Sequence, residues 1–336
     1  MAAHTGNDTA GLLKYYPTLV ETSIYEGLTQ FTDGFNAASG GAIRLEDGAN
    51  PGRRTVSDYY EEIDPVQDRD PTEDSATLTP SKFSNAQKST IKKFHAAPVE
   101  YTRQEWVDRK MVGEDAQRLY GLAYGQRLAQ IYLNTAVAAL VGAIPSATTV
   151  AANTVHDGTA AVFGYDVLNE AMILLGDNDS LASTLVSRSK PIRNLAGAAY
   201  DSSQIAFQFG STVIRGGALP MVGMQLVKSD IPALRNTSPD PDEYDTLVLF
   251  PGAVTIKMGP STSSLDKMPG APGAVPHNMT WLLNTESEFE IEIKGVSWKA
   301  ASVDNPSDAV LSTPANWEEA SDDNALKGPG IIIRTQ

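Results

Sequence analysis

The sequence predicts an α+β protein in which an extended N-terminal part and one long helix precede a mixed domain. Residues 1–102 combine short apolar clusters with Gly, Pro and blocks of charge. Residues 103–142 then place apolar side chains at helical spacing. From residue 143 onward, short helix-like and strand-like segments alternate. An N-terminal part of this kind buries little of its own surface, so we expect it to lie on a partner, most simply another copy of the chain.

Composition limits the class of protein. The chain has 336 residues, of which 41% are hydrophobic and 20% charged, which suits two domains or one domain with large extensions. The absence of cysteine excludes disulfides, thiolate metal sites and cysteine nucleophiles. A polar start and the lack of a long apolar run predict neither a signal peptide nor a membrane span. The absence of cysteine favours synthesis in the reducing cytoplasm.

The net charge of −15 argues against general electrostatic binding of nucleic acid, which depends on clustered Lys and Arg. It is compatible with a container whose wall does not adsorb its contents.

We interpret residues 1–52 as an N-terminal arm. Two short segments, at residues 15–17 and 24–28, each have the pattern of a single turn of helix. Residues 53–102 are predicted to form a long β-hairpin, with strand-like residues at 55–63 and 91–102 and Asp-Pro and Thr-Pro turn signals between them. Acidic residues occupy its outgoing side and lysines its return side. Two interpretations stay open: a solvated hairpin with cross-strand pairing, and a loop that docks on a neighbouring subunit with charge setting its register.

Residues 103–142 carry the clearest periodicity and predict a long helix, ended by Gly142 and Pro145. Three glycines inside it, Gly113, Gly121 and Gly125, indicate either bending or close packing. The polar Arg109, Arg127 and Asn134 are expected opposite an apolar face made of Leu119, Leu122, Ala129, Leu133, Ala136, Val137 and Leu140.

The rest of the chain is predicted to form short helices and strands. Helices are expected at 165–175 and from Ser189 to residue 200, and strands at 181–186, 207–209, 212–214, 221–227, 246–250, 254–258, 281–283, 288–298 and 331–334. In the 288–298 strand, Phe289, Ile291 and Ile293 alternate with glutamates, which predicts one buried face. Residues 259–277, rich in Pro, Gly and Ser, are expected to be a mobile loop.

No set of acid, base and nucleophile converges in the sequence. His4, His95, His156 and His277 lack metal-ligand spacing and are interpreted as surface or loop residues. The Ser-x-x-Lys pattern at 187–190 lacks the Lys-Thr-Gly strand that accompanies it in penicillin-recognising enzymes, so Ser189 is better explained as a helix cap. The acidic loop at 240–245 has carboxylates suited to calcium but lacks the EF-hand pattern, which favours a solvated loop. No cofactor and no metal site are predicted.

This layout resembles the major capsid proteins of tailed bacteriophages, with the Hong Kong 97-type fold. The resemblance covers nearly the whole chain and rests on the order of arm, extended loop, long helix and mixed domain. The local patterns that support it are the strand and Pro-started helix at 181–200, Gly216-Gly217 to Val227, residues 229–232, 246–253, 295–298, 305–306 and 316–318.

The resemblance implies an N-terminal arm at 1–52 and an extended loop at 53–102. It further implies a peripheral domain at 103–179 with a spine helix at 103–142, an axial domain at 180–245, and return strands with the C-terminal part at 246–336. It also implies hexamers and pentamers that form an icosahedral shell around double-stranded DNA in the virion. A separate scaffolding protein, a portal and a decoration protein are the further partners expected.

No catalysis is expected of such a shell protein. The residues expected at contacts between subunits are Tyr59, Tyr60, Phe83, Lys88, Lys92, Lys93, Phe94 and Trp106. Replacing the three lysines with Glu is expected to block assembly without unfolding the subunit. Two alternatives remain: an encapsulin-like compartment shell of the same fold, and a metal-dependent hydrolase that uses the acidic loop at 240–245.

Overall fold

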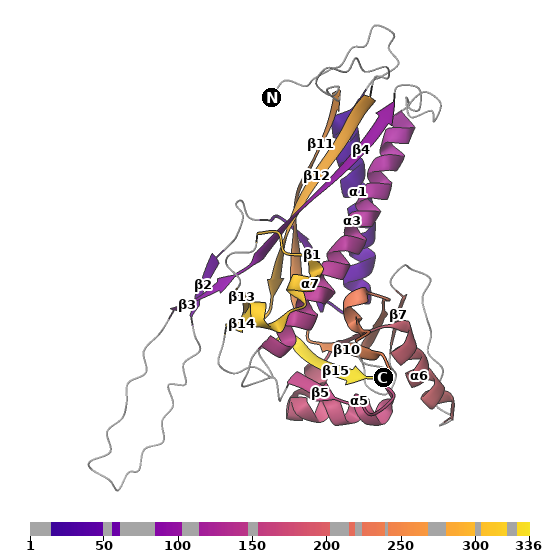
Figure 1. Ribbon diagram of the computed structural model, residues 1–336, viewed down its shortest axis with the longest axis vertical. Coiled ribbons are helices and arrows are strands. Elements are labelled where there is room, and N and C mark those ends of the chain that lie inside the picture. The colour runs from indigo at the N-terminus through magenta and orange to yellow at the C-terminus, as the bar shows by residue number, and fades with distance from the viewer. Residues whose placement is uncertain are drawn as a thin grey trace, which may run out of the picture.

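The computed structural model describes residues 15–49, 56–60, 85–102, 114–146, 154–201, 215–218, 224–238, 241–267, 280–299, 304–320 and 328–336. Two sheets organise these residues. A long four-stranded sheet has the order β1 (Ile43–Asp47), β11 (Val254–Lys267), β12 (Thr280–Ile293) and β4 (Ile91–Thr102). Strand β1 is parallel to β11, and the other neighbours are antiparallel. Its strands run along the long axis of the molecule beside helices α1 (Pro17–Ala38) and α3 (Glu114–Ala143) (Figure 1).

A seven-stranded sheet lies at the other end of the molecule (Figure 1). Its order is β5 (Val155–Asp157), β15 (Gly330–Thr335), β10 (Glu243–Leu249), β6 (Thr184–Ser187), β8 (Gln225–Lys228) and β7 (Arg215–Ala218), and β9 (Arg235–Asn236) pairs with β10. One face packs in a core with α5 (Tyr165–Met172), η2 (Ile173–Leu181) and α6 (Ser189–Asp201). The other face shares the main core with α3.

Smaller elements complete the fold. A short hairpin pairs β2 (Val56–Tyr60) with β3 (Asn85–Ser89), and a second pair joins β13 (Val296–Trp298) to β14 (Trp317–Glu319). Helix α7 (Asp308–Leu311) and the 3₁₀ turns η1 (Ile144–Ser146), η3 (Pro232–Leu234) and η4 (Pro314–Asn316) pack against α3.

Helix α1 was predicted only as two isolated turns, and this prediction was wrong in extent. It is one helix of 22 residues, with Val20, Ile24 and Leu28 buried against α3 and the long sheet. A helix gains most of its stability from packing of an apolar face, so the tertiary contact supports what a local pattern did not reveal.

Close packing explains two of the glycines in the long helix. A Cβ atom added to Gly125 would lie 2.5 Å from the carbonyl oxygen of Ile24, and one added to Gly121 would lie 2.7 Å from that of Val20. On the other helix, a Cβ on Gly27 would lie 2.9 Å from the carbonyl oxygen of Leu122. These distances are too short for a side chain, so the glycines allow the two helix backbones to touch.

Helix α3 confirms the predicted long helix, continuous from Glu114 to Ala143, while residues 103–113 lie outside the described part. Its C-terminal half is buried nearly all round. Leu119, predicted on the buried face, is 66% exposed instead. By length and composition the stretch Gln117–Ser146 could cross a membrane, but 78% of its most apolar window is buried inside the protein, as in a core helix.

The predicted hairpin has a different pairing from the one expected. Strand β2 pairs with β3, whereas β4 pairs along its whole length with β12, far along the chain. Residues 259–267, expected in a mobile loop, belong to β11, and residues 268–279 lie outside the described part. The expected strands at 207–209 and 212–214 also lie outside it. The strands predicted at 281–283 and 288–298 are divided differently, since β12 is continuous over Thr280–Ile293 and β13 is a separate strand. The remaining predicted helices and strands are present with shifted ends.

Candidate functional site

The two faces of the long sheet differ in chemistry. On the face toward α1 and α3, which we call the helix face, Ile256, Phe289 and Ile291 are buried in the main core. On the opposite face, which we call the charged face, the same strands carry Glu46, Lys257, Glu290 and Glu292. The alternation predicted for 288–293 is confirmed for its apolar side, but its polar side is not simply solvated.

Three residues of the charged face form an ion-pair cluster at the root of the β2–β3 hairpin. The carboxylate of Glu292 accepts a hydrogen bond from Lys257 Nζ at 2.9 Å and one from Lys88 Nζ at 3.2 Å. Burial lowers the pKa of Lys88, although Glu292 opposes this effect. Burial by itself would raise the pKa of Glu292, but the two lysines outweigh it and the pKa lies below its ordinary value. The cluster thus ties the hairpin to the sheet.

A second group on this face is buried. Glu290 is fully buried and accepts a 2.5 Å hydrogen bond from the hydroxyl of Thr90. Lys92 lies directly opposite Glu290 across the β4–β12 ladder and is 3% exposed. The Nζ atom of Lys92 is buried without a hydrogen-bond partner among the described residues, so burial rather than an ion pair holds this lysine inside the subunit.

Lys93 faces the other way, onto the helix face. Its Nζ lies 2.9 Å from Asp308 Oδ1, and the same carboxylate accepts a hydrogen bond from Thr135 of α3 at 3.3 Å. Beside it, His95 stacks on Phe289 with ring centroids 5.4 Å apart. Burial, followed by the charge of Lys93, lowers the pKa of His95. This polar group joins β4, α3 and α7.

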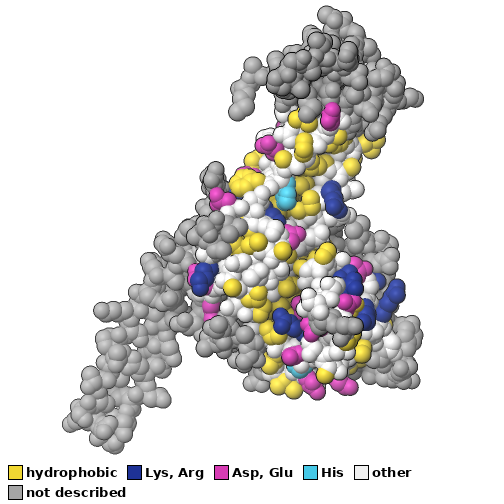
Figure 2. All heavy atoms as spheres, in the orientation of Figure 1, with side chains coloured by type: hydrophobic (Ala, Val, Ile, Leu, Met, Phe, Trp, Pro, Cys, Tyr) yellow, Lys and Arg dark blue, Asp and Glu magenta, His cyan; other side chains and the backbone are white. Residues whose placement is uncertain are grey.

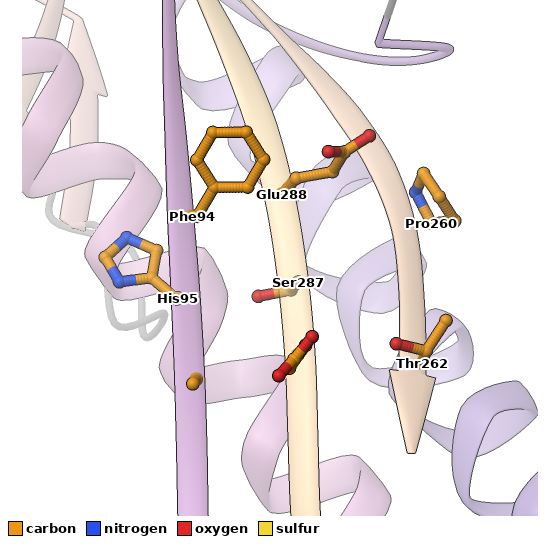
Figure 3. Close-up of a pocket in the computed structure, with 8 residues that line it drawn as sticks. Phe94, His95, Pro260, Thr262, Ser287 and Glu288 are labelled. Atoms are coloured by element: carbon orange, nitrogen blue, oxygen red, sulfur yellow. The ribbon is translucent and has the colours of Figure 1, made fainter. Parts of the chain in front are cut away.

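Farther along the charged face, a pocket of about 420 Å³ opens between β4, β12 and β11 (Figure 3). It is lined by Phe94, His95, Ala96, Pro260, Thr262, Glu286, Ser287 and Glu288. A β-bulge between Met258 and Ser261 shapes one side, and the Glu288 side chain lies across Gly259, where a Cβ would be 2.5 Å from Glu288 Cγ. Phe94 is 41% exposed at the other side.

The predicted contact residues fall in three places. Tyr59 and Tyr60 lie on β2, and Phe83 and Trp106 lie outside the described residues. Phe94 is exposed at the pocket. Lys88, Lys92 and Lys93 are engaged within the subunit, so replacing them with Glu is expected to damage the subunit itself, contrary to the expectation from the sequence. Sequence reasoning did not identify Glu286 and Glu288 as pocket residues or Asp308 as a partner of Lys93, because Phe94 and Lys93 on β4 are about two hundred residues away along the chain.

The geometry of residues 187–190 gives no support to a catalytic Ser-Lys pair. The hydroxyl of Ser187 is buried and lies 2.7 Å from that of Thr246, while Lys190 Nζ lies over the ring of Tyr244, 4.7 Å from its centroid. Ser189 begins α6, but Asp230 does the capping: its carboxylate accepts the Ser189 N–H at 3.0 Å and the Ser189 hydroxyl at 2.6 Å. The predicted capping role of the Ser189 side chain is therefore corrected.

Two of the acidic residues at 240–245 each pair with an arginine. Asp242 accepts hydrogen bonds from Arg235, and Asp245 lies 3.3 Å from Arg334 across the β10–β15 ladder. Burial raises the pKa of Asp245, against the effect of Arg334. Within the described residues, which exclude Asp240, no group of three or more His, Asp or Glu side chains could hold a metal ion.

The other histidines add no site. His156 Nε2 lies 3.8 Å from Glu170, and His4 and His277 lie outside the described residues.

The family comparison decides between these interpretations. A family model described as Gp13-like, major capsid protein 13-like, matches residues 12–331. The chain belongs to this family. The match confirms the function predicted from the sequence, that of a phage major capsid protein. A search among curated proteins finds no match.

Solved structures support the Hong Kong 97-type fold of this major capsid protein. A structure from Microbacterium phage Oxtober96 is 14% identical, has a TM-score of 0.50, and is matched over 88% of this chain and 90% of its own. The acidic stable capsid of Helicobacter pylori bacteriophage KHP30 and the head of bacteriophage KHP40 are each 6% identical, with TM-scores of 0.51. They match 88% of this chain and 88% and 86% of their own.

Proposed function

We propose that this major capsid protein assembles with copies of itself, as hexamers and pentamers, into an icosahedral head that encloses double-stranded DNA. The observation that carries the proposal is the family match over residues 12–331. The net charge of −15 fits a wall that repels packed DNA instead of adsorbing it. Its role is structural, without catalysis, and its place is the virion after synthesis in the host cytoplasm.

Each predicted segment of the subunit has a separate role in the shell. Residues 1–52 act as the arm, 53–102 as the extended loop, 103–179 as the peripheral domain with its spine helix, 180–245 as the axial domain, and 246–336 as the return strands. What supports this is the sheet pairing: β4 pairs with β12 along its whole length, which anchors residues 91–102 of the loop in the long sheet. Many modest contacts from such loops sum to a stable shell.

The contacts between subunits are proposed to involve the aromatic residues of the loop and its root. Tyr59, Tyr60, Phe83, Phe94 and Trp106 supply apolar area of the kind enriched at interfaces. Lys88, Lys92 and Lys93 act at the same contact by fixing the root of the loop, which the ion pairs of Lys88 and Lys93 and the burial of Lys92 support. A scaffolding protein, a portal and a decoration protein complete the set of partners.

Negative-stain electron microscopy of the purified protein, alone and with its co-encoded scaffold, tests the proposal. Shells, tubes or capsomer rings are the expected result. A uniform small species under both conditions would contradict it.

A further inference from the structure

We propose that the pocket on the charged face binds a Lys or Arg side chain from a second copy of this chain. This inference rests on the proposed self-assembly and names a specific contact within it.

The pocket has the chemistry of a cation site. Glu286 and Glu288 are two residues apart on β12, so both side chains project from the charged face. Asn284 donates a hydrogen bond to Glu286 at 3.0 Å, which orients one carboxylate and leaves its charge uncompensated. No salt bridge to either glutamate is present among the described residues. Lys257 of this face and Lys88 of β3 are committed to Glu292 instead, and Lys92 is buried opposite Glu290.

Phe94 supplies an aromatic wall beside the carboxylates (Figure 3). A Lys or Arg side chain has an apolar stem and a charged end, and it is attracted both to an aromatic face and to carboxylate oxygens. The pocket offers Phe94, Ala96 and Pro260 for the stem and the two glutamates for the charge.

The backbone of Phe94 is held by hydrogen bonds although β4 is an edge strand. The side-chain amide of Asn305 accepts the N–H of Phe94 at 3.3 Å and donates to its carbonyl oxygen at 3.1 Å. Asn305 takes a left-handed conformation with φ of 52°, which is unusual for a residue with a side chain. An exposed aromatic side chain on a fixed backbone is typical of an interface anchor, because little entropy is lost on binding.

A second copy can supply the cation. The exposed cations Arg193, on α6, and Lys299, directly after β13, lie outside the long sheet, and Figure 2 shows Lys and Arg side chains gathered over the α6 end of the molecule. The acidic pocket and these basic surfaces are complementary in charge, so neighbouring copies in a shell satisfy both.

The test compares assembly of the full-length wild type with that of Glu286→Gln, Glu288→Gln and Phe94→Leu, using purified subunits with the co-encoded scaffold where it is needed. Glu318→Gln is the matched control, because it removes one exposed carboxylate on a different sheet. Thermal melts of unassembled subunits confirm that each variant is folded. We expect each pocket variant to raise the subunit concentration needed for assembly about threefold to tenfold. We expect Glu318→Gln to match wild type.

The salt dependence of assembly gives a second readout. Wild-type assembly should weaken as salt is added, and the two glutamine variants should lose part of that dependence. Pocket variants that assemble at the wild-type concentration with the wild-type salt dependence would overturn the inference and leave the proposed function intact. Wild-type subunits that form no shell with or without scaffold would overturn both. Unchanged self-assembly with lost binding of a different head protein would overturn the choice of a second copy.

Discussion

The two sheets of this protein differ in what covers them. The seven-stranded sheet shares one face with α5 and α6 and the other with α3, and the apolar runs Leu247–Leu249 of β10 and Ile331–Ile333 of β15 are fully buried. The long sheet has α1 and α3 on its helix face, and its charged face carries paired ions and a pocket. The first sheet is a folding core, whereas the second combines a core face with a surface available to neighbours.

The largest expected effect tests whether the charges of the long sheet belong to the subunit's own fold. The triple variant Lys88→Glu, Lys92→Glu, Lys93→Glu should lower the free energy of unfolding by on the order of 5 kcal/mol, because it places carboxylates beside Glu290, Glu292 and Asp308 with little water. Denaturant unfolding of the soluble subunit measures this. Lys299→Glu, at an exposed position, is the control and should change the free energy of unfolding little. A triple variant as stable as wild type would show that the fold does not depend on these lysines, which could then contact a neighbouring subunit.

The second test concerns the seven-stranded sheet. Ile332 is fully buried on β15, and Ile332→Ala should cost about 3 kcal/mol through lost burial and a cavity. Ile173 is 71% exposed, so Ile173→Ala should stay within about 0.5 kcal/mol of wild type. Equal effects of the two substitutions, measured by denaturant unfolding, would contradict the assignment of this sheet as a core.

The third test addresses how the helix face is covered. Gly125→Ala introduces a Cβ atom that meets the backbone of α1. Although Ala has a higher helix propensity than Gly, the substitution should lower the free energy of unfolding by about 2 kcal/mol. Gly197 of α6 has no atom within 4 Å of an added Cβ, so Gly197→Ala should stabilise by about 0.5–1 kcal/mol. A lower melting temperature for Gly125→Ala together with a higher one for Gly197→Ala would confirm the close helix contact. Higher melting temperatures for both variants would disprove it.

The smallest expected effect is the pH dependence of the ion-pair cluster. The pKa of Glu292 is lowered in the folded protein, so its contribution to stability is present above the ordinary value of 4.5 and is lost as the pH falls through the folded pKa. Glu292→Gln should therefore show a shallower loss of stability in acid than wild type. Unfolding curves from neutral pH to well below 4.5 measure the difference, with Glu318→Gln as a control of equal charge change. Parallel curves for wild type and Glu292→Gln would contradict a stabilising role.

The local sequence determined a large part of the fold. The 3.6-residue pattern in 103–142 is sufficient to predict α3 over its described length, and the alternation around Phe289 predicts one buried face of β12. Helix α6 begins at Ser189 as the Pro at the start of the helix indicates. The order of these elements along the chain is also sufficient to indicate the capsid family.

Only the tertiary structure decided which segments meet. Strand β4 found its partner in β12 and not in the hairpin strand nearest in sequence, and α1 became a long helix because the glycines of α3 let it pack closely. The lysines at 88, 92 and 93 look like a free basic patch in sequence, yet Glu292 and Asp308, two hundred or so residues away, neutralise two of them. Periodicity reports the environment of a single segment, whereas pairing, burial of charge and the shape of a pocket depend on residues that only the folded chain brings together.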